Sequence, residues 1–209
     1  MCAAARTHAG GRIVTRISKL DIAQWDPELR AITAADSATP LEQGVMRMMA
    51  HCPGLAKGMA RFGQTLKANR TLPERLIELV RLRVAFHNQC RSCMAIRYAD
   101  ALKDGITEEL VCSLENPPVA NNLTDAEKAA IAYAEMMATN HLAIDDACYD
   151  GLRRYFTEPE IVELGTVVAF FVGFGRLAAT WHMVEELPRE YQEEDGKVAP
   201  WQAEAIVVR

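Results

Sequence analysis

The chain has 209 residues, with 23 lysines and arginines against 28 aspartates and glutamates, so its formal net charge is −5. This acidic balance, without a basic face or tail, excludes nucleic acid and an anionic membrane surface as the main partner. Half of the residues are apolar. A chain of this length and composition predicts a soluble globular protein with a large core.

Two segments bear on where in the cell the protein is found. Residues 1–37 have no compact apolar stretch of the kind a signal peptide needs, and we expect a partly flexible lead-in to a cytoplasmic protein. The longest apolar run, residues 164–181, is interrupted by three glycines and Arg176, which favours a core helix over a membrane span. Six scattered cysteines are too few for a secreted disulfide scaffold.

Helical periodicity dominates the chain, alternating strand patterns are almost absent, and the fold class is predicted to be all-α. We expect one helical domain over residues 38–187. A C-terminal arm over residues 188–209 either packs on a neighbouring subunit or extends freely. The connector 115–122 is the clearest internal boundary. Helices are predicted at about residues 41–52, 55–66, 73–88, 90–103, from 107, 124–140, 145–156 and 157–187.

An internal similarity appears when the chain is shifted by 85 residues. Glu78 then meets Glu163, Phe86 meets Phe171, and the two cysteines at 90 and 93 meet Gly175 and Ala178. Two amphipathic helices also match at several positions by chance, so an internal helical-hairpin repeat and a chance likeness both remain open.

The motif with the most chemistry is Cys90-x-x-Cys93 at the start of the helix predicted over 90–103. Helix N-termini favour anions, and cysteines three residues apart can close a disulfide, so a redox dithiol is one interpretation. Two core thiols without chemistry are another. Zinc would need two more ligands, and no second close pair exists. A thioredoxin-like fold is excluded because it needs strands in βαβ order. The candidates considered for the missing zinc ligands are Cys52 with His51, Cys112, and Cys148 with His141.

Three other side chains near the motif each have two interpretations. Glu78, two turns into the preceding helix, either acts as a buried general base for the dithiol or pairs with Arg81 on a solvated face. Arg97, four residues after Cys93, either stabilises a Cys93 thiolate or is a surface charge paired with Asp100. His87 either assists the thiols or caps the end of its helix.

The order Glu78, Cys90-x-x-Cys93, "ADALKDGITEEL" resembles the core of the carboxymuconolactone decarboxylase and alkylhydroperoxidase D superfamily, in its peroxidase-related branch. The likeness extends over roughly residues 41–187. It implies an all-α, alkylhydroperoxidase D-like domain that forms a homo-oligomer (dimer, trimer or hexamer) without metal or cofactor. It also implies that Cys93 attacks a hydroperoxide, that Cys90 then closes a disulfide, that Glu78 moves protons, and that a dithiol reductant, such as one of lipoyl type, restores the thiols.

The chain departs from the family pattern where a histidine usually follows the second cysteine by four residues, because Arg97 stands there; Ser92 stands where some active members carry another histidine. Three outcomes are open. Arg97 holds the thiolate while Glu78 moves protons through water, or His87 or His182 enters the site, or the site is weak or serves another reaction.

We therefore expect a thiol-dependent peroxidase or disulfide reductase that reduces hydroperoxides through the dithiol. The catalytic set would be Cys93, Cys90, Glu78, Arg97 and His87. An alternative is a catalytically weak helical oligomer that binds a small apolar ligand or a partner protein. The methionines Met46, Met48, Met49 and Met59 suit that surface, although such a stripe also suits core packing. A carboxymuconolactone-type decarboxylase is the minor alternative.

Overall fold

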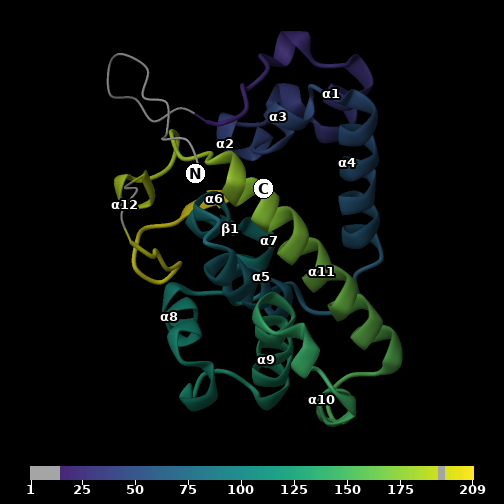
Figure 1. Ribbon diagram of the computed structural model, residues 1–209, viewed down its shortest axis with the longest axis vertical. Helices are drawn as coiled ribbons and strands as arrows, with labels where there is room; N and C mark the ends of the chain where they lie inside the picture. Colours follow the sequence, from purple (N-terminus) through teal and green to yellow (C-terminus); the bar gives the residue numbers. More distant parts are fainter. Residues whose placement is uncertain (1–14, 193–195) are drawn as a thin grey trace.

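The computed structural model describes residues 15–192 and 196–209, and it is built almost wholly of helices (Figure 1). Short 3₁₀ turns join several of them. The elements are α1 (Pro27–Thr33), α2 (Pro40–Gln43), α3 (Met46–Met49), α4 (Pro53–Ala68), α5 (Glu74–Asn88), α6 (Arg91–Ala95), β1 (Ile96–Tyr98), α7 (Ala99–Lys103), α8 (Glu108–Cys112), α9 (Asp125–Thr139), α10 (Asp146–Arg153), α11 (Glu158–Trp181), α12 (Arg189–Gln192) and β2 (Ile206–Val208).

Helix α5 is the centre of the molecule and packs against both α9 and α11. Every residue from Leu76 to Ala85 is buried. A helix that is apolar on all sides is expected inside a core, and α5 meets that description except for three charged side chains. Each of these is paired, because a lone buried charge is costly: Glu78 with Arg81, and Arg83 with Glu135 of α9.

In Figure 1 two groups of helices lie at opposite ends of the view, with α6 and α7 beside α5 between them. Helices α1, α3 and α4 pack together at one end, around buried Trp25 and Leu29. Helices α9 and α10 lie at the other end and contact α11 there. The long helix α11 contacts both groups: it packs on α9 and α10, and its Phe170 ring lies 5.6 Å from the Phe62 ring of α4.

The helix predicted over residues 41–52 is divided in two. Gly44 has φ +47°, in the left-handed region, and a Cβ there would lie 3.2 Å from the carbonyl oxygen of Leu41. Helix α2 therefore ends and α3 starts after a sharp turn. The partly flexible lead-in predicted for residues 1–37 needs a similar correction: α1 and two 3₁₀ turns occupy much of residues 22–37, whereas residues 1–14 lie outside the described residues.

The single helix predicted over residues 90–103 is wrong in its middle. Helix α6 stops at Ala95, β1 follows, and α7 resumes at Ala99. The cause lies at the far end of the sequence, because β1 pairs in parallel with β2. A three-residue strand whose partner lies about 110 residues away has no local signal that could reveal it.

The C-terminal arm packs on its own domain, directly over the dithiol segment. The side-chain amide of Gln89 donates to the carbonyl of Val198 and accepts from its N–H. The Phe86 and Trp201 rings lie 4.9 Å apart, and Arg91 donates to the carbonyl of Tyr191. We predicted either a free arm or an arm that packs on a neighbouring subunit. The arm instead packs on its own chain, and we call residues 196–209, which cover the dithiol segment, the clasp.

Helix α11 is long and apolar enough to cross a membrane by length and composition alone. Core helices of soluble proteins pass the same test. In this fold α11 buries Ile161, Leu164, Val167 and Val168 in the core shared with α5 and α9. Its likeness to α5 at an offset of 85 residues is compatible with a repeat, which stays a prediction.

Gly175 sets the distance between α5 and α11. A Cβ on it would lie 2.6 Å from the side-chain nitrogen of Asn88, which donates to the carbonyls of Phe171 and Val172 while its oxygen accepts from Arg176. Overpacking costs about 1–3 kcal/mol, whereas alanine favours a helix over glycine by about 1 kcal/mol.

We therefore expect Gly175→Ala to be less stable than Gly173→Ala by about 1–3 kcal/mol. Gly173, on the same helix, has no neighbour within 4 Å of the added carbon, so it supplies the matched control. Urea unfolding of the two variants measures the difference directly. Equal stabilities would show that Asn88 moves aside freely.

Candidate active site

Cys90 and Cys93 form a disulfide with a Cα–Cα distance of 5.2 Å. Gln89 ends α5 in the left-handed conformation, which turns the chain sharply, and Cys90 is the N-cap of α6. Cys93 lies three residues later, one turn along the same face. The two sulfurs differ in access: Cys90 is 0 % exposed, whereas Cys93 is half-buried and lines two cavities.

Arg81 joins the predicted carboxylate to the dithiol segment. Its guanidinium donates two bonds of 2.7 Å to the two oxygens of Glu78, and further bonds to the carbonyl oxygens of Cys93 and Ile96. Glu78 is 2 % exposed and Arg81 6 % exposed. Burial lowers the pKa of Arg81, but the Glu78 carboxylate raises it by more, so the net pKa is raised and the guanidinium stays charged.

The predicted pairing partner of Glu78 is confirmed, but its predicted solvated location is wrong. Glu78 pairs with Arg81 at i,i+3, yet the pair is buried and not solvated. Arg81 donates to both oxygens of the carboxylate, and the same guanidinium donates to the carbonyl oxygen of Cys93. Its role as a general base stays a prediction.

Two cavities of about 260 Å³ each lie on either side of Arg81. The first, which we call the phenylalanine cavity, is mostly apolar; its lining includes Phe170, Phe171, Phe174, Met59, Arg81 and Cys93. The second, which we call the carboxylate cavity, is lined by charged groups at its rim; these include Glu78, Arg81, Lys67, Asp100, Arg70 and Glu74. A small molecule in the phenylalanine cavity would thus meet one thiol and one cation.

Strand β1 places two side chains on the dithiol side. Because side chains alternate along a strand, Ile96 and Tyr98 share one face and Arg97 takes the other. Ile96 lines the phenylalanine cavity, and Tyr98 lines both this cavity and the carboxylate cavity. The Arg81 guanidinium carbon lies 5.1 Å from the centre of the Tyr98 ring, so the two side chains form a partition between the cavities.

The predicted position of Arg97 on the helix face of Cys93 is wrong, because the helix ends at Ala95. Its guanidinium, 1 % exposed, forms two bonds of 3.0 Å to Glu108 and donates to the carbonyl oxygens of Met94, Ile96 and Pro200. The alternative partner, Asp100, binds Lys67 and Lys103 instead. Arg97 therefore ties the dithiol segment to α8 and to the C-terminal arm.

His87 faces α9. Its Nε2 lies 3.4 Å from the Glu135 carboxylate. Burial lowers the pKa of His87, the Arg83 guanidinium lowers it further, and Glu135 opposes both effects. The neutral imidazole is thus favoured. No contact between His87 and either cysteine is seen among the described residues, so its predicted assistance to the thiols stays a prediction.

His182 and Ser92 line a third, small cavity of about 30 Å³. The Ser92 hydroxyl lies 3.6 Å from the sulfur of Cys90. His182 follows directly after α11. The structure therefore brings the histidine that aligns with Arg97 at the 85-residue offset to the Cys90 side of the motif.

The remaining candidate residues are placed elsewhere. The thiols of Cys52 and Cys112 are exposed, and Cys148 lies on α10. Within residues 15–192 and 196–209, no group of three or more His, Cys, Asp or Glu side chains is arranged to hold a metal ion. Met48 is buried, and Met46 and Met49 pack on the cluster around Trp25, so these methionines are core residues.

Arg81 and Tyr98 are the two site residues that the sequence analysis did not propose. Arg81 was considered only as a surface partner of Glu78. Its position offered a signal, because residues 78, 81 and 85 share one face of a helix that is otherwise apolar on all sides. Tyr98 offered none, since its placement depends on the distant pairing of β1 with β2.

Comparison with known proteins agrees with this architecture. Residues 53–136 match the model of the carboxymuconolactone decarboxylase family. Two uncharacterized proteins from strains of Mycobacterium tuberculosis are 38% identical over 89 residues, which is 42% of this chain and 31% of each relative. The chain thus spans about a third of the length of these curated relatives.

Solved structures extend the likeness to the whole fold. The alkylhydroperoxidase AhpD core of an uncharacterized peroxidase-related protein from Ralstonia eutropha JMP134 has a TM-score of 0.72 at 18% identity, covering 87% of this chain and 96% of that chain. The debrominase Bmp8 has a TM-score of 0.64 at 19% identity, covering 80% and 90%. A variant of Bmp8 is known in complex with 2,3,4-tribromopyrrole. A protein of unknown function from Agrobacterium tumefaciens, a putative antioxidant defence protein, scores 0.56 at 19% identity over 67% and 94%.

Proposed function

We propose that this chain, whose residues 53–136 match the carboxymuconolactone decarboxylase family and whose fold is shared with alkylhydroperoxidase D-like proteins, is a thiol-dependent reductase of organic hydroperoxides. The observation that carries the proposal is the unequal exposure of the two sulfurs beside an arginine. Cys93 opens into the phenylalanine cavity next to Arg81, while Cys90 is enclosed behind it.

The reaction follows from this asymmetry. The Cys93 thiolate attacks the outer oxygen of the hydroperoxide, the O–O bond breaks, and the alcohol leaves after taking a proton. Cys93 is then a sulfenic acid. The Cys90 thiol attacks its sulfur, water leaves, and the disulfide forms. Two thiols have supplied the two electrons that convert one hydroperoxide into one alcohol and one water.

Arg81 supplies the electrostatic part. Its charge is fixed by Glu78 and by the carbonyl of Cys93, so it needs no rearrangement when a thiolate or an alkoxide develops nearby. The Tyr98 ring under it closes the cavity on one side. A dithiol donor, of lipoyl type in our proposal, then attacks Cys93, the accessible sulfur, and restores both thiols.

A test uses the reduced wild-type protein and one equivalent of an apolar organic hydroperoxide. We expect loss of two thiols per chain, release of one alcohol, and repeated turnover when a dithiol is supplied. Slow and uniform labelling of all cysteines, with no thiol lost to the hydroperoxide, would instead indicate a helical protein that binds ligands or partners without this chemistry.

A second candidate is reductive dehalogenation of a small halogenated aromatic. It is favoured by the rings that line the phenylalanine cavity, where the centres of Phe170 and Phe174 are 4.9 Å apart, and by the likeness in fold to a debrominase. There a carbon–halogen bond would become carbon–hydrogen, halide would leave, and the dithiol would become the disulfide. The same assay with a bromopyrrole and a bromide measurement separates the two reactions.

Assembly is part of the proposal. Helix α11 exposes apolar side chains on more than one face: Val162 is 67 % exposed, and Phe174, which lines the phenylalanine cavity, is 37 % exposed. Burying such a face against another copy would remove apolar surface from water. This supports a homo-oligomer.

A further inference from the structure

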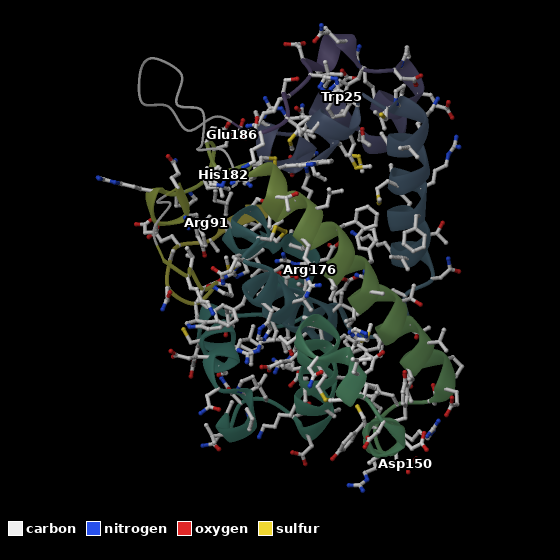
Figure 2. The ribbon with its side chains drawn as sticks, viewed as in Figure 1. Trp25, Arg91, Asp150, Arg176, His182 and Glu186 are labelled. Carbon is white, nitrogen blue, oxygen red and sulfur yellow. A yellow bond between two sulfur atoms is a disulfide. The ribbon has the colours of Figure 1, made fainter. Side chains whose placement is uncertain are left out.

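The small cavity behind the disulfide is polar and has room for one water molecule. Its volume is about 30 Å³, and its lining includes Ser92, His182, Gln89 and Arg91. Figure 2 shows His182 and Arg91 on the same side of the molecule, near the end of α11. The lining of this small cavity shares only Ala178 with the phenylalanine cavity, and Ser92 also lines, together with Cys93, a further cavity of about 310 Å³.

Ser92 connects this cavity to Cys90. Its hydroxyl oxygen lies 3.6 Å from the Cys90 sulfur. A disulfide sulfur carries no hydrogen, so in this state the serine is the donor and Cys90 the acceptor. Cys90 is fully buried, and a buried thiolate is unfavourable, so this sulfur needs a nearby group that takes its proton and returns it.

The backbone of His182 forms the left-handed C-cap of α11, which fixes where its side chain leaves the helix. His182 ends α11 with φ 57° and ψ 55°, in the left-handed region. Few residues other than glycine adopt it, although histidine, asparagine and aspartate do so more often than most. The conformation leaves the imidazole lining the same cavity as the Ser92 hydroxyl.

We propose that His182 exchanges the proton of Cys90 through one water molecule and the Ser92 hydroxyl. The inference rests on the proposed dithiol chemistry and adds its proton acceptor. Arg97 cannot take this role, since its guanidinium is engaged by Glu108 and three carbonyl oxygens and cannot accept a proton.

The relay acts in both half-reactions. During oxidation, Cys90 passes its proton through Ser92 and the water to His182 as its sulfur bonds to Cys93. The hydroxyl of the sulfenic acid leaves as water after taking a proton from solvent, and His182 later returns one proton to solvent. During reduction, a donor thiolate bonds to Cys93, the electron pair of the disulfide goes to Cys90, and His182 supplies the proton that neutralises it.

The test separates the two cysteines in single turnover. We expect His182→Asn, which keeps a residue suited to the left-handed backbone, to form sulfenic acid on Cys93 at the wild-type rate. Closure of the disulfide should be slower by about 100- to 10,000-fold. Trapping of the sulfenic acid by a dione reagent and loss of the Cys90 thiol measure the two steps. Closure at the wild-type rate would overturn the relay and leave the proposed function intact.

Ser92 provides the second readout. Ser92→Ala should slow closure to a similar degree, Ser92→Thr should restore it by keeping a hydroxyl, and the double variant with His182→Asn should be no slower than either single one. Independent structural damage would instead multiply the two effects, which would overturn the proposal.

Reduction of the preformed disulfide by dithiothreitol tests the relay without any hydroperoxide. We expect the same slowing in His182→Asn, together with a smaller solvent deuterium isotope effect than in the wild type. Equal reduction rates would overturn the relay even if the protein proves inactive towards hydroperoxides, so the two failures are distinguishable.

Discussion

Cys93→Ser is expected to abolish hydroperoxide turnover, whereas Cys90→Ser should carry out one oxidation and then stop. The reason is the difference in access: Cys93 lines the phenylalanine cavity and Cys90 is fully buried. A serine hydroxyl is far less nucleophilic than a thiolate. Turnover should therefore fall by several orders of magnitude in Cys93→Ser.

Stopped-flow mixing and intact-protein mass measurement distinguish the two variants. Cys90→Ser should gain one oxygen atom, the mass of a sulfenic acid, while Cys93→Ser should gain none. Cys52→Ser, which changes an exposed thiol distant in sequence from the motif, is the control. If Cys93→Ser retained turnover and Cys90→Ser lost it completely, the assignment of the two cysteines would be reversed.

Arg81→Met is expected to destabilise the protein by about 3–5 kcal/mol, because it leaves the Glu78 carboxylate buried without its partner. It also removes donors from the carbonyl oxygens of Cys93 and Ile96, and hence loosens the dithiol segment. We expect loss of turnover even under conditions in which the variant remains folded. Chemical unfolding and turnover, measured on the same preparation, check both parts.

Arg83→Met supplies a matched control for this prediction. Arg83 lies two residues later on α5, is also buried, and binds Glu135 and the carbonyl of Leu114 on another face of the helix. It should lose stability but keep turnover while folded. A double variant, Glu78→Leu with Arg81→Met, removes both charges and should regain stability without regaining activity. Full activity in that variant would show that the pair is only structural.

The sequence was a good guide wherever the fold depends on local patterns. The apolar spacing in α5, the capping box at Thr124 and the connector before it all predicted elements that the structure contains. The pairing of Glu78 with Arg81 could also be proposed, because residues three apart are neighbours on a helix. Burial of that pair could not, since it depends on α9 and α11 packing around α5.

The prediction failed where two distant segments decide the conformation together. Arg97 was placed on a helix because nothing within residues 90–103 opposes one. Parallel pairing of β1 with β2 converts Ile96–Tyr98 into a strand, buries Arg97 against the arm, and brings Tyr98 beside Arg81. Turn and helix signals act over a few residues, so they contain no information on such a contact.

The clasp of residues 196–209 over the dithiol segment has a consequence for synthesis of the protein. Strand β1 gains its partner, and Gln89 and Arg97 gain their acceptors on Val198 and Pro200, only after those residues have left the ribosome. A nascent chain that has already formed α5, α9 and α11 therefore still carries an unfinished thiol segment, open to oxidants and to wrong partners until residues 196–209 emerge from the ribosome.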